Sequence, residues 1–157
     1  MNMKRRVFLK GTLAGSAVAV AVGAGLLSPR QVLAAAWPHT AYEAKTVQDA
    51  LKGLFGNDLT EASNTIEIKA PEIAENGAVV PVTIETALKG VESISILAEN
   101  NPTALIASFT LAANTKPTIS TRIKMGKTGN VIAVVKSGGK LYSARKEVKV
   151  TIGGCGG

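Results

Sequence analysis

The segment Val80-Pro81-Val82-Thr83-Ile84-Glu85 alternates apolar and polar side chains. Successive side chains of a β-strand point to opposite faces, so this alternation predicts a strand with one buried and one exposed face. Pro81 interrupts the row of backbone donors, because proline has no N–H. We therefore expect this strand to lie at a sheet edge or beside a β-bulge.

Six further segments have strand character, and turn-forming Gly, Asn and Pro residues separate most of them. Before the first of them, apolar residues recur at helical spacing from Glu43 to Phe55, and Gly56 closes the run. About seven short strands at this spacing predict an immunoglobulin-like antiparallel β-sandwich. The predicted fold class is all-β, with one N-terminal helix. The six segments are Ile66–Ile68, Ile94–Ile96, Leu105–Leu111, Ile119–Met125, Val131–Lys136 and Tyr142–Ile152.

Residues 1–36 have the features of an export signal. Arg5 and Arg6 begin it, residues 11–27 form an uncharged run rich in Ala and Gly, and three consecutive alanines end it. This order predicts a secretory signal, and the paired arginines indicate the Tat route, which exports folded proteins. The apolar run is shorter than the roughly 20 residues that span a membrane, so a membrane anchor is the weaker alternative. We expect a periplasmic mature domain over residues 37–152, without a membrane segment.

The composition limits the chemistry of that domain. The 157 residues include one Cys and one His, which excludes an internal disulfide and a metal site with several Cys or His ligands from this chain. His39 is expected to be an ordinary residue near the mature N-terminus. No pair of carboxylates has the spacing of an acid–base site. The sequence therefore predicts neither a metal nor another cofactor.

Charge is distributed unevenly along the chain, whose formal net charge is +7. Residues 37–100 contain 4 basic and 10 acidic residues, whereas residues 101–157 contain 9 basic residues and 1 acidic residue. Arg122 and Lys124 lie two positions apart on a predicted strand and so share a face. Two interpretations are open: solvated strand faces, or a surface that docks a complementary partner or attracts small anions.

The chain ends in Gly153-Gly154-Cys155-Gly156-Gly157, directly after the last predicted strand. Glycine has the freest backbone of all residues, so these five positions predict a flexible arm. Fully extended, the arm reaches about 17 Å, and its thin backbone lets the Cys155 thiol enter a narrow pocket of another protein. No side chain within two residues can hold the thiol as a thiolate, as a catalytic cysteine requires. The thiol is therefore predicted to be an attachment point for a substrate.

Two other uses of Cys155 remain open from the residues alone. An unpaired cysteine in an exported protein can form an intermolecular disulfide, which would make the chain a binding or structural module. A thiol enzyme, such as a peroxidase or isomerase, would need an activating group that the tail lacks. The first of these is the main alternative to an attachment point.

Four features together resemble the SoxY family, the sulfur carriers of the periplasmic Sox thiosulfate-oxidising system. They are the Tat-type leader, the stretch Ile73–Val82, the stretch Thr121–Met125 and the terminal Gly-Gly-Cys-Gly-Gly motif. The resemblance covers the whole chain and supports the immunoglobulin-like fold. It implies a carrier subunit without a cofactor rather than an enzyme.

The resemblance also implies a role for each residue of the tail. Cys155 would carry the covalently attached sulfur intermediates, and Gly153, Gly154, Gly156 and Gly157 would form the swinging arm. The implied partners are a SoxZ-like subunit in a heterodimer, a SoxAX-type cytochrome, a SoxB-type hydrolase and, where present, a SoxCD-type dehydrogenase. No nucleic-acid partner is expected.

Overall fold

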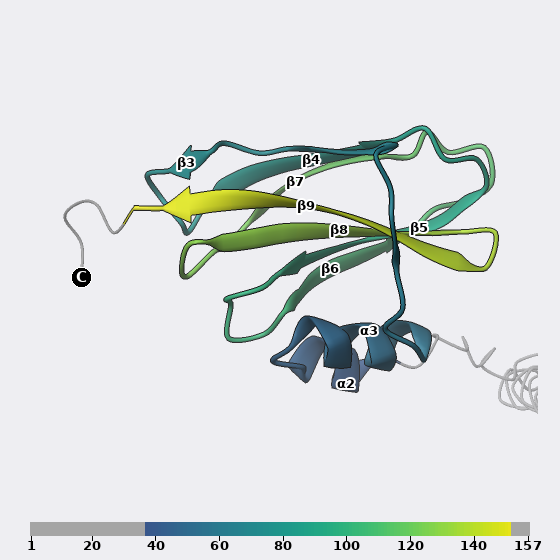
Figure 1. Cartoon of the computed structure of the whole chain (residues 1–157), viewed down its shortest axis with the longest axis horizontal. Helices are drawn as coiled ribbons and strands as arrows, with labels where there is room; N and C mark the ends of the chain where they lie inside the picture. The colour runs from purple at the N-terminus through teal and green to yellow at the C-terminus, as the bar shows by residue number, and fades with distance from the viewer. Residues whose placement is uncertain (1–36, 152–157) are drawn as a thin grey trace, which may run out of the picture. The chain divides into compact units, whose positions relative to one another are not determined.

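A computed structural model of the chain describes residues 37–151. The predicted leader, residues 1–36, and the predicted arm, residues 153–157, lie outside the described residues. Two layers of β-sheet form the domain, and two short helices lie against the larger sheet (Figure 1). The elements are α2 (His39–Glu43), α3 (Val47–Phe55), β1 (Glu61–Ala62), β2 (Ile66–Lys69), β3 (Ile73–Ala74), β4 (Val80–Thr86), β5 (Val91–Ala98), β6 (Leu105–Thr110), β7 (Thr118–Ile123), β8 (Gly129–Ser137) and β9 (Lys140–Val150).

The larger sheet has the strand order β1-β9-β8-β5-β6, with β3 also paired to β9, and the smaller sheet has the order β2-β4-β7. All seven strands predicted from the sequence are present, and the pairs among them are antiparallel. This arrangement confirms the predicted all-β sandwich. The sequence prediction missed β1 and β3, which pair with β9 in parallel. Each has two residues, too few to produce a periodic pattern.

The prediction for Pro81 is correct only for one side of its strand. Strand β4 lies between β2 and β7, so it is not an edge strand as a whole. The pairing with β2 stops at Lys69, opposite Thr83, and Pro81 lies beyond that point. On its other side Pro81 stands opposite Arg122 of β7. The missing N–H therefore falls where β4 has a partner on one side only.

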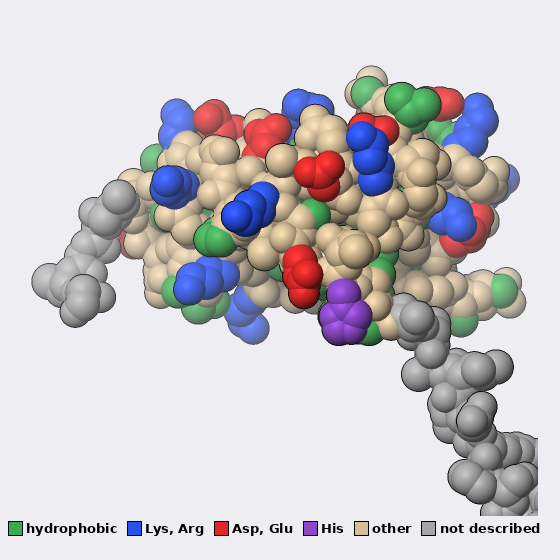
Figure 2. All heavy atoms as spheres, turned by 90° about the horizontal axis from the view of Figure 1, so that it is seen from below, with side chains coloured by type: hydrophobic (Ala, Val, Ile, Leu, Met, Phe, Trp, Pro, Cys, Tyr) green, Lys and Arg blue, Asp and Glu red, His purple; other side chains and the backbone are tan. Residues whose placement is uncertain are grey.

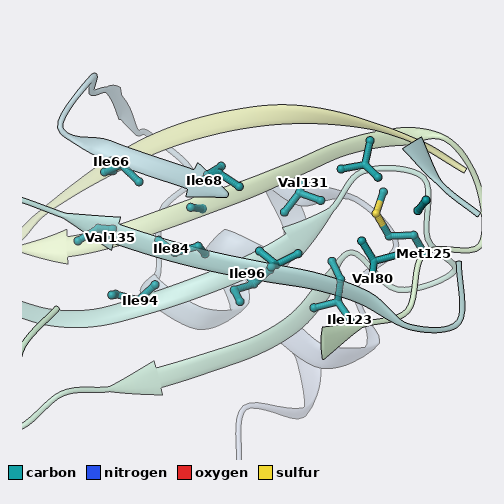
Figure 3. Close-up of a cluster of buried hydrophobic side chains, with 14 residues drawn as sticks. Ile66, Ile68, Val80, Ile84, Ile94, Ile96, Ile123, Met125, Val131 and Val135 are labelled. Atoms are coloured by element: carbon teal, nitrogen blue, oxygen red, sulfur yellow. The ribbon is translucent and has the colours of Figure 1, made fainter. Parts of the chain in front are cut away.

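The core lies between the two sheets and is made by the alternating strands. Val80, Val82 and Ile84 of β4 are at most 1% exposed and pack with Ile94 and Ile96 of β5 (Figure 3). Burying an aliphatic side chain of this size stabilises the fold by about 1.5–3 kcal/mol. The segment that predicted the fold is thus also the centre of the core.

The helical region differs from the prediction of one helix over Glu43–Phe55. The structure has two helices, because Ala44 is extended and Thr46 starts a new helix by accepting a hydrogen bond from the Asp49 backbone N–H. Gly53 lets the helices touch, since a Cβ there would lie 2.8 Å from the backbone nitrogen of Ala41. Both helices cover the outer face of the larger sheet through a second apolar cluster. Neither described helix has the length and apolar character needed to span a bilayer.

Candidate functional site

The site begins where β9 ends, because the predicted arm continues from that strand. Cys155 and its four flanking glycines lie outside the described residues. Strand β9 ends at Val150, beside β3 and beside the turn that precedes β8 (Figure 1). Three loops surround this point: residues 75–79, 99–104 and 124–128. Together with the last residues of β9, we call them the β9 end.

Backbone hydrogen bonds fix the last residues of β9. The Lys149 N–H donates to the Glu72 carbonyl at 2.9 Å, and the Thr151 N–H donates to the Ala74 carbonyl at 3.1 Å. Both acceptors belong to β3 or the residue just before it. The short parallel strand therefore holds the chain in place as far as Thr151, four positions before Cys155.

Thr128 holds the opposite side of the same strand end. Its hydroxyl accepts from the Val150 N–H at 2.9 Å and lies 3.4 Å from the Val150 carbonyl, to which it can donate. The Asn100 side-chain amide donates to the Thr128 carbonyl at 2.8 Å. Asn100 and Thr128 thus link two loops to the terminus of β9.

Asn101 ties the same two loops together at a second point. Its side-chain N–H donates to the Lys124 carbonyl at 2.7 Å, and its side-chain oxygen accepts from the Gly126 N–H at 2.9 Å. In the sequence, Asn100, Asn101 and Thr128 lie in turn-forming segments and indicate no site. Their hydrogen bonds join residues at least 22 positions apart. No local sequence pattern predicts such contacts.

A pocket of about 520 Å³ opens beside these loops. Leu105 and Ile106 of β6 provide apolar walls, and Lys124 is the charged residue of its lining. The pocket therefore offers apolar contact together with one positive charge. The remaining lining residues are Asn101, Pro102, Thr103 and Gly126.

The surface of the β9 end combines basic and apolar side chains with two exposed carboxylates, Glu75 and Glu99. Lys124, Lys127 and Lys149 are exposed, and none forms an ion pair within residues 37–151. Ile73 is 57% exposed and Val79 is 50% exposed, which is unusual for large aliphatic side chains. Figure 2 shows several basic side chains at the end of the molecule where β9 ends, and further basic and acidic side chains over the rest of this face. Such a mixed surface suits protein docking.

The described groups with shifted pKa values lie on strand faces outside these loops. A hydrogen bond from Lys69 to Glu85 raises the pKa of Lys69 and lowers that of Glu85. A hydrogen bond from Lys136 lowers the pKa of Glu92, and one to Glu61 raises the pKa of Lys140. Lys69, Glu92 and Lys140 are exposed and Glu85 is half-buried, so the pairs are surface contacts between strands. His39 is exposed on α2, and no group of three or more metal-ligating side chains is found in residues 37–151.

We expect Thr128→Val to loosen the end of β9 without unfolding the domain. The valine keeps the side-chain volume but cannot accept from Val150, so the Val150 amide should exchange its hydrogen about two- to tenfold faster. The Ser143 amide, in the middle of β9, should exchange as before. Thr128→Ser keeps the hydroxyl and is the matched control. Equal exchange at Val150 in the Val and Ser variants would show that the hydroxyl does not hold the strand.

Fold and site together define a small β-sandwich whose last strand is held to its end and leads into a cysteine-bearing tail. The family described as "Sulfur oxidation protein SoxY" matches residues 51–155, a match that reaches Cys155. The chain belongs to the SoxY family. This membership confirms the resemblance noted in the sequence.

Solved structures agree with that assignment. The sulfur carrier protein SoxY from Chlorobium limicola f thiosulfatophilum is 50% identical, with a TM-score of 0.61, over 66% of this chain and 94% of that chain. A superoxide reductase (neelaredoxin) from Ignicoccus hospitalis is 21% identical, with a TM-score of 0.50, over 55% of this chain and 80% of that chain, which supports the fold alone. A comparison with curated proteins gave no match. With the family established, the prediction of a carrier subunit in sulfur oxidation, and not an enzyme, is confirmed.

Proposed function

We propose that the protein carries sulfur intermediates of thiosulfate oxidation on the Cys155 thiol and presents them to partner enzymes on a C-terminal arm. The observation that carries the proposal is the family match, which runs through the sandwich and reaches Cys155. The described structure supports it, because hydrogen bonds hold the chain up to Thr151. The four residues after Thr151, up to Cys155, if extended, would let the sulfur reach about 13 Å from that anchor.

In the proposed cycle the partner enzymes catalyse the reactions, and Cys155 holds the sulfur intermediates covalently. In the first step, the thiol and thiosulfate lose two electrons and one proton, and a sulfur–sulfur bond forms to give a Cys155 thiosulfonate. A SoxAX-type cytochrome would take the electrons. In the second step, water cleaves the bond between the sulfane and sulfone sulfurs, which releases sulfate and two protons. A SoxB-type hydrolase would catalyse that step, and a SoxCD-type dehydrogenase, where present, would oxidise the persulfide that remains.

The surface around the arm fits this role. The exposed Lys124, Lys127 and Lys149 lie at the β9 end together with Glu75 and Glu99, and the three lysines can contact anionic substrates and intermediates. The exposed Ile73 and Val79 add apolar contact area for a partner enzyme. We also propose that the Tat-type leader, with Arg5 and Arg6, exports the protein to the periplasm in complex with a SoxZ-like subunit, whose own export would depend on it.

Intact mass spectrometry of protein isolated from the periplasm tests the proposal. After exposure of the cells to thiosulfate, we expect mass increments of sulfur, sulfonate or thiosulfonate that disappear on treatment with a reductant. The same spectrum reports the N-terminus, which we expect within a few residues of Trp37. Spectra that contain only disulfide-linked chains, and no sulfur adduct, would favour the module that forms intermolecular disulfides. A mass that begins at Met1 would contradict signal cleavage.

A further inference from the structure

The two sides of the sandwich differ in how their sheet edges are covered. On one side, β1 and β3 pair with β9, and β2 packs against β9. On the other side, β6 ends the larger sheet and β7 ends the smaller one. The pocket lined by Ile106 and Lys124 joins these two strands at the β9 end. This side therefore carries two strand edges that are unpaired within residues 37–151.

The pairing of β7 with β4 determines which backbone N–H and C=O groups of β7 face the open edge. The Thr86 N–H donates to the Pro117 carbonyl, and hydrogen-bonded pairs recur every second residue in an antiparallel ladder. Ile119 and Thr121 therefore use their backbone groups toward β4, opposite Ile84 and Val82. The backbone N–H and C=O groups of Ser120 and Arg122 therefore point to the open edge.

Of the two open edges, β7 is the one suited to receive another strand. Its register with β4 is continuous over six pairs. Strand β6 has a register shift at Ile96/Leu97, which leaves Ile106 without an opposite residue. A bulge of this kind bends an edge and opposes strand addition. The regular edge is therefore β7.

Charge identifies the kind of partner. Residues 101–128, which contain β6, β7 and the loop after β7, include Lys116, Arg122, Lys124 and Lys127 and no acidic residue. The Arg122 side chain is exposed beside the free edge and forms no ion pair within the described chain. Two copies that paired symmetrically through β7 would place these cations against each other. The edge instead complements a strand flanked by Asp or Glu.

We propose that β7 is the edge on which the second subunit of the proposed heterodimer docks, by adding a strand with acidic flanks. This inference rests on the proposed partnership and names the surface that serves it. The backbone groups of Ser120 and Arg122 provide the ladder, and the Arg122 side chain fixes the register by pairing with a carboxylate. The β9 end, with the cysteine tail, stays accessible to the enzymes of the pathway.

Ser120→Pro tests the proposal, with Ser120→Ala as its matched control. Both changes remove the hydroxyl that contacts Thr83, but only proline removes the N–H that faces the open edge, a position where proline is tolerated. The probe is the purified SoxZ-like subunit of the same organism. We expect the proline variant to bind it at least about tenfold more weakly than the alanine variant. Arg122→Gln should weaken binding and reduce its dependence on salt.

Hydrogen exchange provides a second measurement, which uses the wild-type protein and therefore needs no variant to fold. In the wild-type complex, the amides of Ser120 and Arg122 should become protected. If the complex forms but these amides stay unprotected and the proline variant binds like the alanine variant, the docking edge is wrong while the heterodimer stands. Absence of any complex would overturn the partnership and the docking edge together. If the isolated protein self-associates and Ser120→Pro abolishes that, the edge belongs to a second copy and the proposal is wrong. Sulfur carriage on Cys155 is judged separately, by the adduct masses.

Discussion

Cys155→Ser should abolish thiosulfate-dependent sulfate formation while the domain stays folded. The carrier role needs a sulfur–sulfur bond to the side chain, and a serine hydroxyl cannot form one. The substitution lies four positions beyond Thr151, the last described residue, so it removes no contact of the described core. The measurement is sulfate production by the reconstituted system or by cells, together with the thermal unfolding midpoint of the purified variant.

A displaced thiol provides the control for that experiment. Thr110→Cys, combined with Cys155→Ser, restores one thiol on an exposed strand position that has no glycine arm. We expect no sulfur adduct and no sulfate from this double variant, because the thiol cannot reach into a narrow active site. Sulfate production at the wild-type rate in Cys155→Ser would refute carriage on Cys155. Recovery of activity in the double variant would refute the need for the arm.

Gly77→Ala should destabilise the domain and disturb the support of the arm. Gly77 accepts a hydrogen bond from the Met125 N–H at 2.7 Å. A Cβ at this position would collide with the Met125 carbonyl oxygen and lie 2.8 Å from Cγ1 of Val150. Overpacking of this kind costs about 1–3 kcal/mol, and relief requires movement of the loop or of the last β9 residues. Urea unfolding measures the loss of stability, and sulfate formation measures the effect on the arm.

Gly126→Ala is the matched control, since it adds the same methyl group at the same end of the sandwich. The nearest atom to that Cβ would be the Asn101 side-chain oxygen, 3.9 Å away. We expect the urea midpoint of this variant to stay close to that of the wild type. If both alanine variants had the same stability, the close packing of Gly77 against Val150 would not matter for the fold.

The sequence predicted the elements that have a periodic pattern of apolar residues. Alternation in segments such as Val80–Glu85 and Tyr142–Ile152 identified most of the seven longer strands, because a half-buried strand needs that period, and Val131–Lys136 was identified as a nearly continuous apolar run. The same rule could not find the two-residue strands β1 and β3, which depend on the pairing with β9. It also extended the helix through Ala44, where helical spacing continues but the backbone is extended.

The sequence offers a local signal for the chemistry of the site and none for its support. The signal is the cysteine tail, and the role of Cys155 stays a prediction. Thr128 and Asn101 are ordinary polar residues in sequence, and their role comes from contacts with residues 22 to 25 positions away. Long-range contacts of this type require the folded arrangement of the strands.

The clamped strand that leads to the tail has a mechanical consequence. In the proposed cycle, a pull on the tail by a partner enzyme would pass along the axis of β9, whose ladder with β8 runs over nine residue pairs. Hydrogen bonds of an antiparallel ladder lie perpendicular to the strand axis. A force along that axis therefore loads all of them together in shear and does not break them one after another. Bonds to β3 and to Thr128 share the load at the point of attachment. If the proposed arm is pulled from an enzyme pocket, we expect this arrangement to keep β9 in the sheet.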